Sequence, residues 1–251
     1  MPNLVRSVLR LAVVASLISA GAGFASAGIT NPSTTVAGVK RETFLVIHAS
    51  LPGRAALDCL SPCNGSPLSE VFVRHFGRET RASAFADAFT TEVDTISGGR
   101  QRSWSMNAGS SSRAILPDGC KPVALVFANA DYRFASRLRG PVLDERRVTQ
   151  HLRSLDVPTT SIVDADGATL RAALSAFVSK LGSDSCAIVY LAGHGVDIDG
   201  RHYFAGTDID TSGGKAPDEQ AIDIDDLLRQ VGDGAVVVLD MNFSKVKPSV
   251  R

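Results

Sequence analysis

The segment CAIVYLAGHG, residues 186–195, decides how this sequence folds. Its first seven residues are apolar, which is typical of a strand buried on both faces of a parallel sheet. The segment ends on His194 between two glycines, Gly193 and Gly195. We expect this histidine to lie just past the end of the strand, at the sheet edge where α/β folds bind their ligands.

Strand-like and helix-like segments alternate around this stretch. The predicted strands are 122–128, 159–165, 186–192 and 235–241, and the predicted helices between them are 141–155, 167–181 and 222–231. This order predicts a mostly parallel sheet sandwiched between helices. The strand 235–241 carries Asp240 near its end, so Asp240 should lie at the same edge as His194.

The region before residue 105 predicts a shorter strand-and-helix unit. Residues 43–50 are a compact apolar run typical of a strand. Ser66 followed by Pro67 predicts the start of a helix, because serine caps helices and proline favours their first position. A second helix is predicted over 79–96, with apolar residues at helical spacing.

Composition bounds the class of protein. The chain has 251 residues, which suits one α/β domain or two small ones. Its 26 basic and 26 acidic residues balance. A neutral chain offers no electrostatic basis for binding nucleic acid or an anionic membrane surface.

The N-terminus reads as an export signal. Arg6 and Arg10 precede an apolar run over 11–24, and Ala25-Ser26-Ala27 fits a cleavage site. Residues 1–27 are therefore predicted to be a signal peptide, followed by a flexible leader over 28–41. This predicts a periplasmic or secreted protein with no membrane attachment after cleavage, and an uncleaved anchor is the alternative.

Four cysteines, Cys59, Cys63, Cys120 and Cys186, permit disulfides in an exported chain. No histidine or second cysteine pair stands at zinc-site spacing, so no metal is expected. No motif indicates a cofactor.

Several motifs of the C-terminal half resemble one family. The stretch IVYLAGHGVDIDGRHYFAGTDID (188–210) is similar to the histidine loop and hairpin of the caspase-like cysteine peptidases, peptidase C14, which include caspases, metacaspases and bacterial members. VALVFANADY (123–132), LRGPVLDERRVTQHL (138–152) and VVVLDMN (236–242) resemble their first strand, first helix and nucleophile strand. The resemblance implies a three-layer caspase-like α/β fold.

The N-terminal half resembles the other end of the same family. LVIHASLPGRAALD (45–58) and GSPLSEVFVRHF (65–76) are similar to the strand, loop and helix that normally follow the nucleophile. The two halves therefore stand in swapped order, as in a circular permutation. We expect a small-subunit-like half over 42–104, a linker over 105–120 and a large-subunit-like half over 121–251, packed as one domain. Halves that do not pack together are the alternative.

The resemblance implies roles for residues at the sheet edge. His194 matches the general base, and Gly195 matches a backbone donor to the oxyanion. Asn242 occupies the position of the nucleophilic cysteine, and an amide cannot replace a thiolate. The expected function is that of a pseudopeptidase retained as a binding or regulatory module. The alternative is an active cysteine endopeptidase that cleaves after basic residues with a displaced or partner-supplied cysteine.

Asp144 and Asp240 match positions that resemble an acidic pocket for arginine or lysine. The alternatives are an aspartate favoured by the helix dipole and one satisfied by loop amides. The expected partner is a peptide or protein ligand, with a basic peptide and an active caspase-like relative as candidates. In the caspase-like fold the first and third strands are neighbours, so we expect a disulfide between Cys120 and Cys186 at their starts.

Overall fold

The computed structural model describes residues 44–107, 113–212 and 215–246, all of which fall in one compact unit, Val36–Arg251. The predicted signal peptide and leader, 1–41, lie outside the described residues. Within the described ranges no helix is long and apolar enough to span a bilayer.

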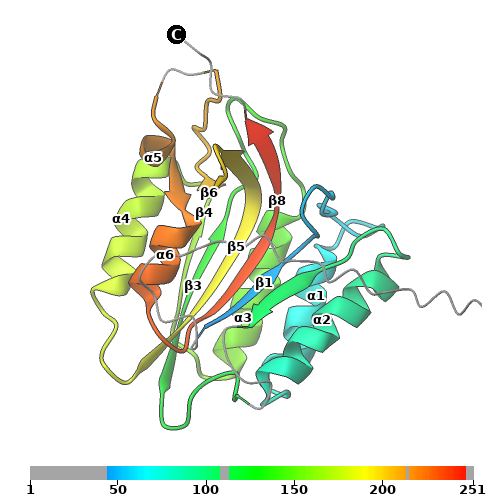
Figure 1. Cartoon of the computed structure of the whole chain (residues 1–251), viewed down its shortest axis with the longest axis vertical. Helices are drawn as coiled ribbons and strands as arrows, with labels where there is room; N and C mark the ends of the chain where they lie inside the picture. Colours follow the sequence, from blue (N-terminus) through cyan, green and yellow to red (C-terminus); the bar gives the residue numbers. More distant parts are fainter. Residues whose placement is uncertain (1–43, 108–112, 213–214, 247–251) are drawn as a thin grey trace, which may run out of the picture. The chain divides into compact units, whose positions relative to one another are not determined.

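Eight strands of the described chain form one mixed sheet (Figure 1). Their bounds are β1 Leu45–His48, β2 Trp104–Asn107, β3 Lys121–Ala128, β4 Thr159–Val163, β5 Ser185–Ile198, β6 Arg201–Ala205, β7 Ala221–Asp223 and β8 Val236–Val246. The main path of the sheet is β2-β1-β8-β5-β3-β4, and β6 and β7 extend from β5. The strands from β1 to β4 along this path are parallel, and β2 pairs antiparallel at one edge.

The N-terminal strand lies where the sequence predicts it. β1 pairs in parallel with β8, with Leu45 opposite Val236 and His48 opposite Leu239. The strand predicted within 43–50 is therefore present, and it lies directly beside the strand predicted within 235–241. A strand from the first quarter of the chain thus lies beside the last strand.

Six described helices cover the two faces of the sheet. They are α1 Pro67–His75, α2 Ala82–Ile96, α3 Pro141–Ser154, α4 Gly167–Val178, α5 Pro217–Gln220 and α6 Ile224–Val231. Figure 1 shows α1, α2 and α3 on one face and α4 and α6 on the other. Two apolar clusters fill the interfaces, the first including Leu68, Phe72 and Val148 and the second including Leu170, Leu174 and Leu227. The expected three-layer α/β fold is therefore present.

The helix starting at Pro67 forms as its sequence predicts. The Ser66 side chain accepts a hydrogen bond from the Ser69 N–H at 3.0 Å, and Pro67 occupies the first helical turn. Helix α2 starts three residues later than expected. Residues before it pair with the segment after 113, because the Ile115 N–H donates to the Thr80 carbonyl and the Ala82 N–H to the Arg113 carbonyl.

Part of the predicted linker belongs to the core. Ile115 is buried against the helix layer that holds α1 and α2. Its apolar side chain supplies burial that a free linker would lack. Residues 108–112 lie outside the described chain.

Candidate functional site

A cavity of about 170 Å³ lies beside the carboxyl-terminal halves of the parallel strands β5 and β8. It collects residues from both halves of the chain: Ala56, Leu57, Asp58, Ser66, Leu138, Pro141, Asp144, Gly193, His194, Asp240, Met241, Asn242 and Ser244. Four of the residues expected to form a site, His194, Asn242, Asp144 and Asp240, are among them. We refer to this space as the edge cavity.

His194 and Asn242 are direct neighbours on adjacent strands. They occupy opposite positions in the parallel pairing of β5 with β8. The expectation that His194 lies just past a strand end is wrong, because β5 continues to Ile198 and β8 to Val246. Pairing over eleven positions, from Ile188 opposite Val236 onward, keeps both strands extended through the site.

A backbone contact of the His194 ring shows which of its two nitrogens carries a hydrogen. Its Nε2 lies 2.7 Å from the carbonyl oxygen of Ser136. A carbonyl only accepts, so Nε2 must carry the proton and donate it. In the neutral ring Nδ1 then holds the lone pair, which is the atom that can take a proton from a nucleophile.

The loop before α3 also holds the His194 backbone. The Tyr132 hydroxyl accepts the His194 N–H at 2.8 Å, and the two rings lie 4.5 Å apart. A Cβ at Gly193, whose φ is +155°, would lie 2.5 Å from that hydroxyl. Gly193 therefore permits the close approach of Tyr132 to the strand.

Gly195 lies inside the sheet. It stands opposite Phe204 of β6 and Phe243 of β8. A Cβ at this position would meet the Phe243 ring at 2.7 Å. Packing against Phe243 therefore accounts for a glycine here, and Gly193 is the glycine that lines the edge cavity.

Two buried carboxylates face each other across Ser66. Asp144 is 1% exposed and Asp240 is 7% exposed. The Ser66 N–H donates to Asp144 Oδ1 at 2.7 Å, and the Ser66 hydroxyl donates to Asp240 Oδ2 at 2.5 Å. Tyr190 donates a further hydrogen bond to Asp240 Oδ2 at 2.6 Å. We call Asp144 and Asp240 the acidic pair.

Burial changes the protonation of the acidic pair. Burial first, and then the charge of Asp144, raise the pKa of Asp240 to about 8. Burial raises the pKa of Asp144 to about 6, against the lowering effect of its hydrogen bonds from Ser69 and Ser66. The pair therefore holds a proton near neutral pH and carries less than two negative charges.

Asp58 is a further site residue that the motifs did not single out. Its carboxylate accepts the Arg139 N–H at 2.8 Å and the Gly140 N–H at 2.9 Å, at the start of α3. A Cβ at Gly140 would lie 1.9 Å from the Asp58 carbonyl oxygen. No motif in either segment indicates this contact, because Asp58 and its partners Arg139 and Gly140 stand more than 80 residues apart in the sequence.

All four cysteines form disulfides. Cys120 and Cys186 pair with their Cα atoms 5.8 Å apart, at the starts of β3 and β5, which is the pairing that the family resemblance implied. Cys59 pairs with Cys63, with Cα atoms 5.2 Å apart, in the loop before α1. Neither disulfide leaves a free thiol to act as a displaced nucleophile.

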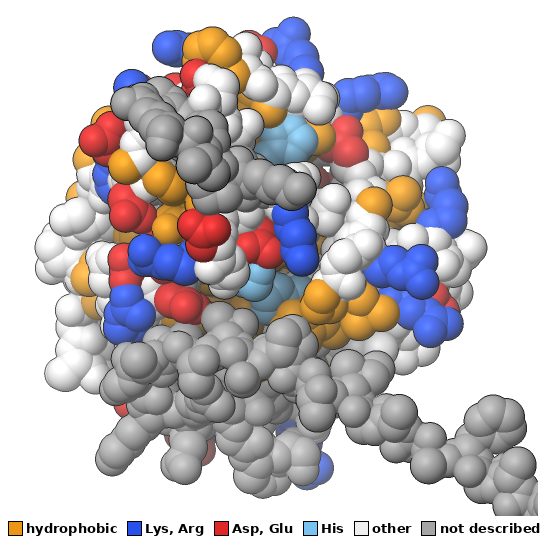
Figure 2. Space-filling view, turned by 45° about the horizontal axis from the view of Figure 1, so that its top comes forward, with side chains coloured by type: hydrophobic (Ala, Val, Ile, Leu, Met, Phe, Trp, Pro, Cys, Tyr) orange, Lys and Arg blue, Asp and Glu red, His pale blue; other side chains and the backbone are white. Residues whose placement is uncertain are grey.

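The surface around this edge carries charges of both signs. Figure 2 views the molecule with the carboxyl end of β8 brought forward, and acidic, basic and histidine side chains are mixed there. In the described part of the chain, no cluster of three or more histidine, cysteine, aspartate or glutamate side chains could hold a metal ion.

The fold and the edge cavity define an α/β protein of the caspase-like class. Comparison with known families supports this, because the model of the caspase domain, peptidase C14, matches residues 121–245. Residues 121–245 of the chain therefore form a caspase-like domain of the C14 family.

One curated relative is similar over a shorter stretch. The human mucosa-associated lymphoid tissue lymphoma translocation protein 1 is 31% identical over 86 residues. That stretch covers 34% of this chain, and the chain spans only a tenth of the relative's length.

Proposed function

We propose that this protein is a pseudopeptidase: a caspase-like peptidase homologue that binds a peptide at the edge cavity without cleaving it. The observation that carries the proposal is Asn242, which stands opposite His194 where the family resemblance expects a cysteine. An amide nitrogen shares its lone pair with the carbonyl, so it does not attack a peptide bond as a thiolate does.

The two disulfides favour binding over an alternative catalytic route. A displaced nucleophile would have to be Cys59 or Cys63, which lie in the loop between β1 and α1. These two cysteines are bonded to each other. Cys186 is 3% exposed at the opposite end of β5 from His194. Catalysis would then require a cysteine supplied by a partner.

The ligand is proposed to present a basic side chain. Asp240 lines the edge cavity and uses Oδ2 for both of its hydrogen bonds from Ser66 and Tyr190. Its Oδ1 is therefore the oxygen that a guanidinium or ammonium group would reach. A cation beside the acidic pair would displace the proton that burial holds there.

The swapped order of the two halves is proposed to reflect a circular permutation. Residues 45–107 supply β1, α1, α2 and β2 to a sheet whose remaining strands all come from 121–246. The caspase-domain match covers only the second of these regions. If residues 45–107 followed β8 in the chain instead of preceding β3, their strands and helices would take the same places in the fold.

Export is proposed on the sequence of residues 1–27 and on the cysteine usage. Disulfides persist in oxidising compartments such as the periplasm and the extracellular space. Mature protein beginning after Ala27, found outside the cytoplasm, would support this placement. Full-length protein retained in the cytoplasm would contradict it.

Binding is tested by calorimetric titration of the purified protein with N-acetyl-arginine amide. N-acetyl-citrulline amide is the matched control, since it has the same shape without the charge. We expect the arginine compound to bind at least tenfold more tightly. Equal affinities, or turnover of arginine-, lysine- or aspartate-ended fluorogenic peptides by the natural protein, would contradict the proposal.

A further inference from the structure

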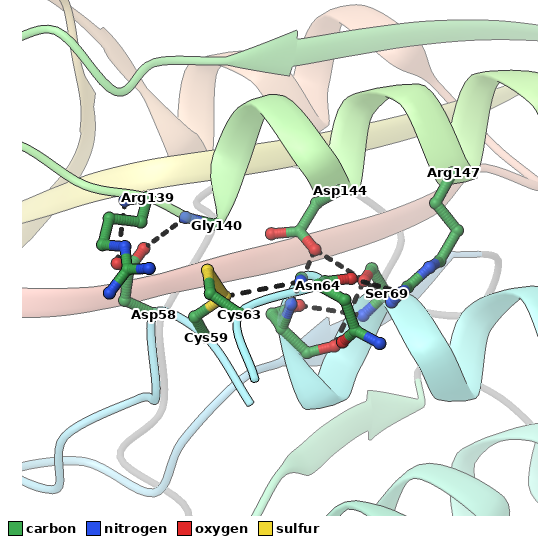
Figure 3. Close-up of a disulfide and its surroundings, with 11 residues drawn as sticks. Asp58, Cys59, Cys63, Asn64, Ser69, Arg139, Gly140, Asp144 and Arg147 are labelled. Carbon is green, nitrogen blue, oxygen red and sulfur yellow. Dashed lines mark hydrogen bonds between the residues drawn. A yellow bond between two sulfur atoms is a disulfide. The ribbon is translucent and has the colours of Figure 1, made fainter. Parts of the chain in front are cut away.

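The loop of residues 51–65, which we call the cavity loop, lines the edge cavity through Ala56, Leu57 and Asp58, and the Cys59–Cys63 disulfide closes a small ring within it. Figure 3 shows this disulfide between the start of α3 and the start of α1. We propose that it is a redox latch: reduction by a dithiol loosens the loop and weakens ligand binding at the edge cavity. The part of this inference that concerns ligand binding rests on the proposed function.

On one side of the disulfide, the loop caps α3. Asp58 immediately precedes Cys59, and its carboxylate holds the N–H groups of Arg139 and Gly140. The Asp58 backbone also packs so closely on Gly140 that no side chain fits between them. The position of the α3 start therefore depends on the position of residue 58.

On the other side, the loop leads into the acidic pair. The Asn64 carbonyl accepts a hydrogen bond from Arg147 of α3. The Gly65 carbonyl accepts the Leu60 N–H at 3.0 Å, and the Gly65 N–H contacts the Cys59 sulfur at 3.4 Å. Ser66 follows directly and holds both Asp144 and Asp240.

The disulfide thus ties together two short segments, both of which line the edge cavity. Only three residues separate the two cysteines, so the bond closes a small ring that fixes the path of the chain from Cys59 to Cys63. Without the bond, residues 58 and 66 can move apart. The hydrogen bonds that Asp58 accepts from the start of α3 should then break more often. The expected consequence is local opening, with the sheet itself unchanged.

The two disulfides differ in their access to a reductant. Cys59 and Cys63 are both partly exposed, and Cys63 borders an open groove between α1 and α3. In the other disulfide Cys120 is partly exposed as well, but its partner Cys186 is 3% exposed, with Pro117 and Gly234 packed at that end of the sheet. A dithiol should therefore reach the Cys59–Cys63 bond first.

Reduction of the disulfide by a dithiol needs no protein group other than the two cysteines. A thiolate of the dithiol attacks the Cys63 sulfur, and the Cys59 thiolate leaves. The second thiol of the reductant then displaces Cys63 and forms a cyclic disulfide. Two electrons pass to the protein, and each released thiolate takes up a proton.

The test combines alkylation mapping with amide hydrogen exchange on the folded, full-length mature protein. Dithiothreitol is added, free thiols are blocked with iodoacetamide, and the modified cysteines are located by mass spectrometry. We expect modification at Cys59 and Cys63 before Cys120 and Cys186. The amides of Arg139, Gly140 and Leu60 should exchange at least tenfold faster, whereas those of Leu125 and Val189 in the central strands should change less than twofold.

The variant that lacks only this bond, Cys59→Ser with Cys63→Ser, should show the faster exchange with and without dithiothreitol. Resistance of the Cys59–Cys63 bond in the folded protein would overturn the proposal. Reduction without a change in these amides would also overturn it.

A titration with N-acetyl-arginine amide forms the second arm. We expect at least tenfold weaker binding to the reduced protein. Equal binding to both forms would overturn the latch. Binding to neither form would contradict the proposed basic ligand, while the exchange measurement would still decide whether the loop opens.

Discussion

Asp144 and Asp240 set the electrostatics of the edge cavity. Each is almost fully buried, and Ser66 connects them through its N–H and its hydroxyl. Two carboxylates at such close quarters cannot both ionise freely, so burial and mutual repulsion keep a proton on the pair. A basic ligand would turn this unfavourable pair into an ion pair.

The acidic pair predicts a pH dependence of stability. The pKa of Asp240 is raised from 3.8 to about 8 in the folded protein, so between these pH values the folded state binds more protons than the unfolded state. Its contribution to the free energy of unfolding is therefore largest at low pH and falls as pH rises toward 8. The Asp240→Asn variant lacks this contribution.

Urea denaturation at pH 5, 6, 7 and 8 measures the effect. Relative to Asp240→Asn, the natural protein should lose stability with increasing pH, by up to about 1.4 kcal/mol per pH unit. Asp87→Asn, at an exposed position of α2, is the matched control and should run parallel to the natural protein. Parallel curves for Asp240→Asn as well would show that Asp240 does not hold the proton.

At the level of elements, the start of α3 packs against the cavity loop at Gly140. Gly140 lacks the side chain that would meet the Asp58 carbonyl oxygen at 1.9 Å. The Gly140→Ala variant must therefore shift the backbone of one of the two segments. We expect it to lower the free energy of unfolding by about 1–3 kcal/mol, as overpacked sites do.

Gly182→Ala is the control for this prediction. A Cβ at Gly182 meets first an Asp184 carboxylate oxygen at 3.1 Å, which lies on a side chain that can rotate away. Its stability should differ from that of the natural protein by less than about 1 kcal/mol. Thermal unfolding of both variants tests the prediction. Equal stability of Gly140→Ala and Gly182→Ala would show that the loop moves away from the added methyl group without loss of stability.

Elements with strong local signals could be predicted from the sequence, and elements fixed by distant contacts could not. The strand after Cys186 and the helix capped by Ser66 carry their own signals, in a continuous apolar run and a Ser-Pro start. The late start of α2 could not be foreseen, because residues near 80 pair with residues near 114, more than thirty positions away. The same holds for the continuation of β5 beyond His194, which depends on pairing with β8.

The residues of the candidate site also fall into those that the sequence could predict and those that it could not. His194, Asp144, Asp240 and Asn242 were identified because motifs of the caspase-like family contain their positions. Asp58 and the Ser66 contacts were not, because their partners are backbone amides and carboxylates of the other half of the chain. Such contacts leave no periodic pattern in the sequence.

In the molecule as a whole, the two halves share one sheet and one core. β1 lies between β2 and β8, and the apolar cluster on that face joins Leu68 and Phe72 of the first half to Val148 and Leu152 of the second. Neither half buries this surface alone. Covalent continuity between the halves should therefore not be needed to hold the folded protein together.

A protease recognition sequence inserted between residues 109 and 110 tests this expectation. After cleavage, both fragments should elute together in size-exclusion chromatography and unfold in a single transition. The matched control is the same insertion left uncleaved. Separation of the fragments under native conditions would contradict a shared core and, with it, the proposed permutation.

The central claim is that the edge cavity retains the parts of a cysteine peptidase except its nucleophile. In the proposed function, Nδ1 of His194 is the base and the acidic pair binds a basic side chain; both groups line the edge cavity. A general base contributes about 10²–10⁴-fold to such reactions, so a thiol restored beside it should give measurable turnover. The Asn242→Cys variant restores that thiol.

The decisive measurement is the cleavage of arginine- and lysine-ended fluorogenic peptides by the natural protein, by Asn242→Cys and by Asn242→Cys combined with His194→Ala. The account predicts no cleavage by the natural protein, measurable cleavage by the single variant after arginine or lysine, and loss of that cleavage in the double variant. Equal cleavage by the natural protein and Asn242→Cys would contradict the account, because the nucleophile would then lie elsewhere.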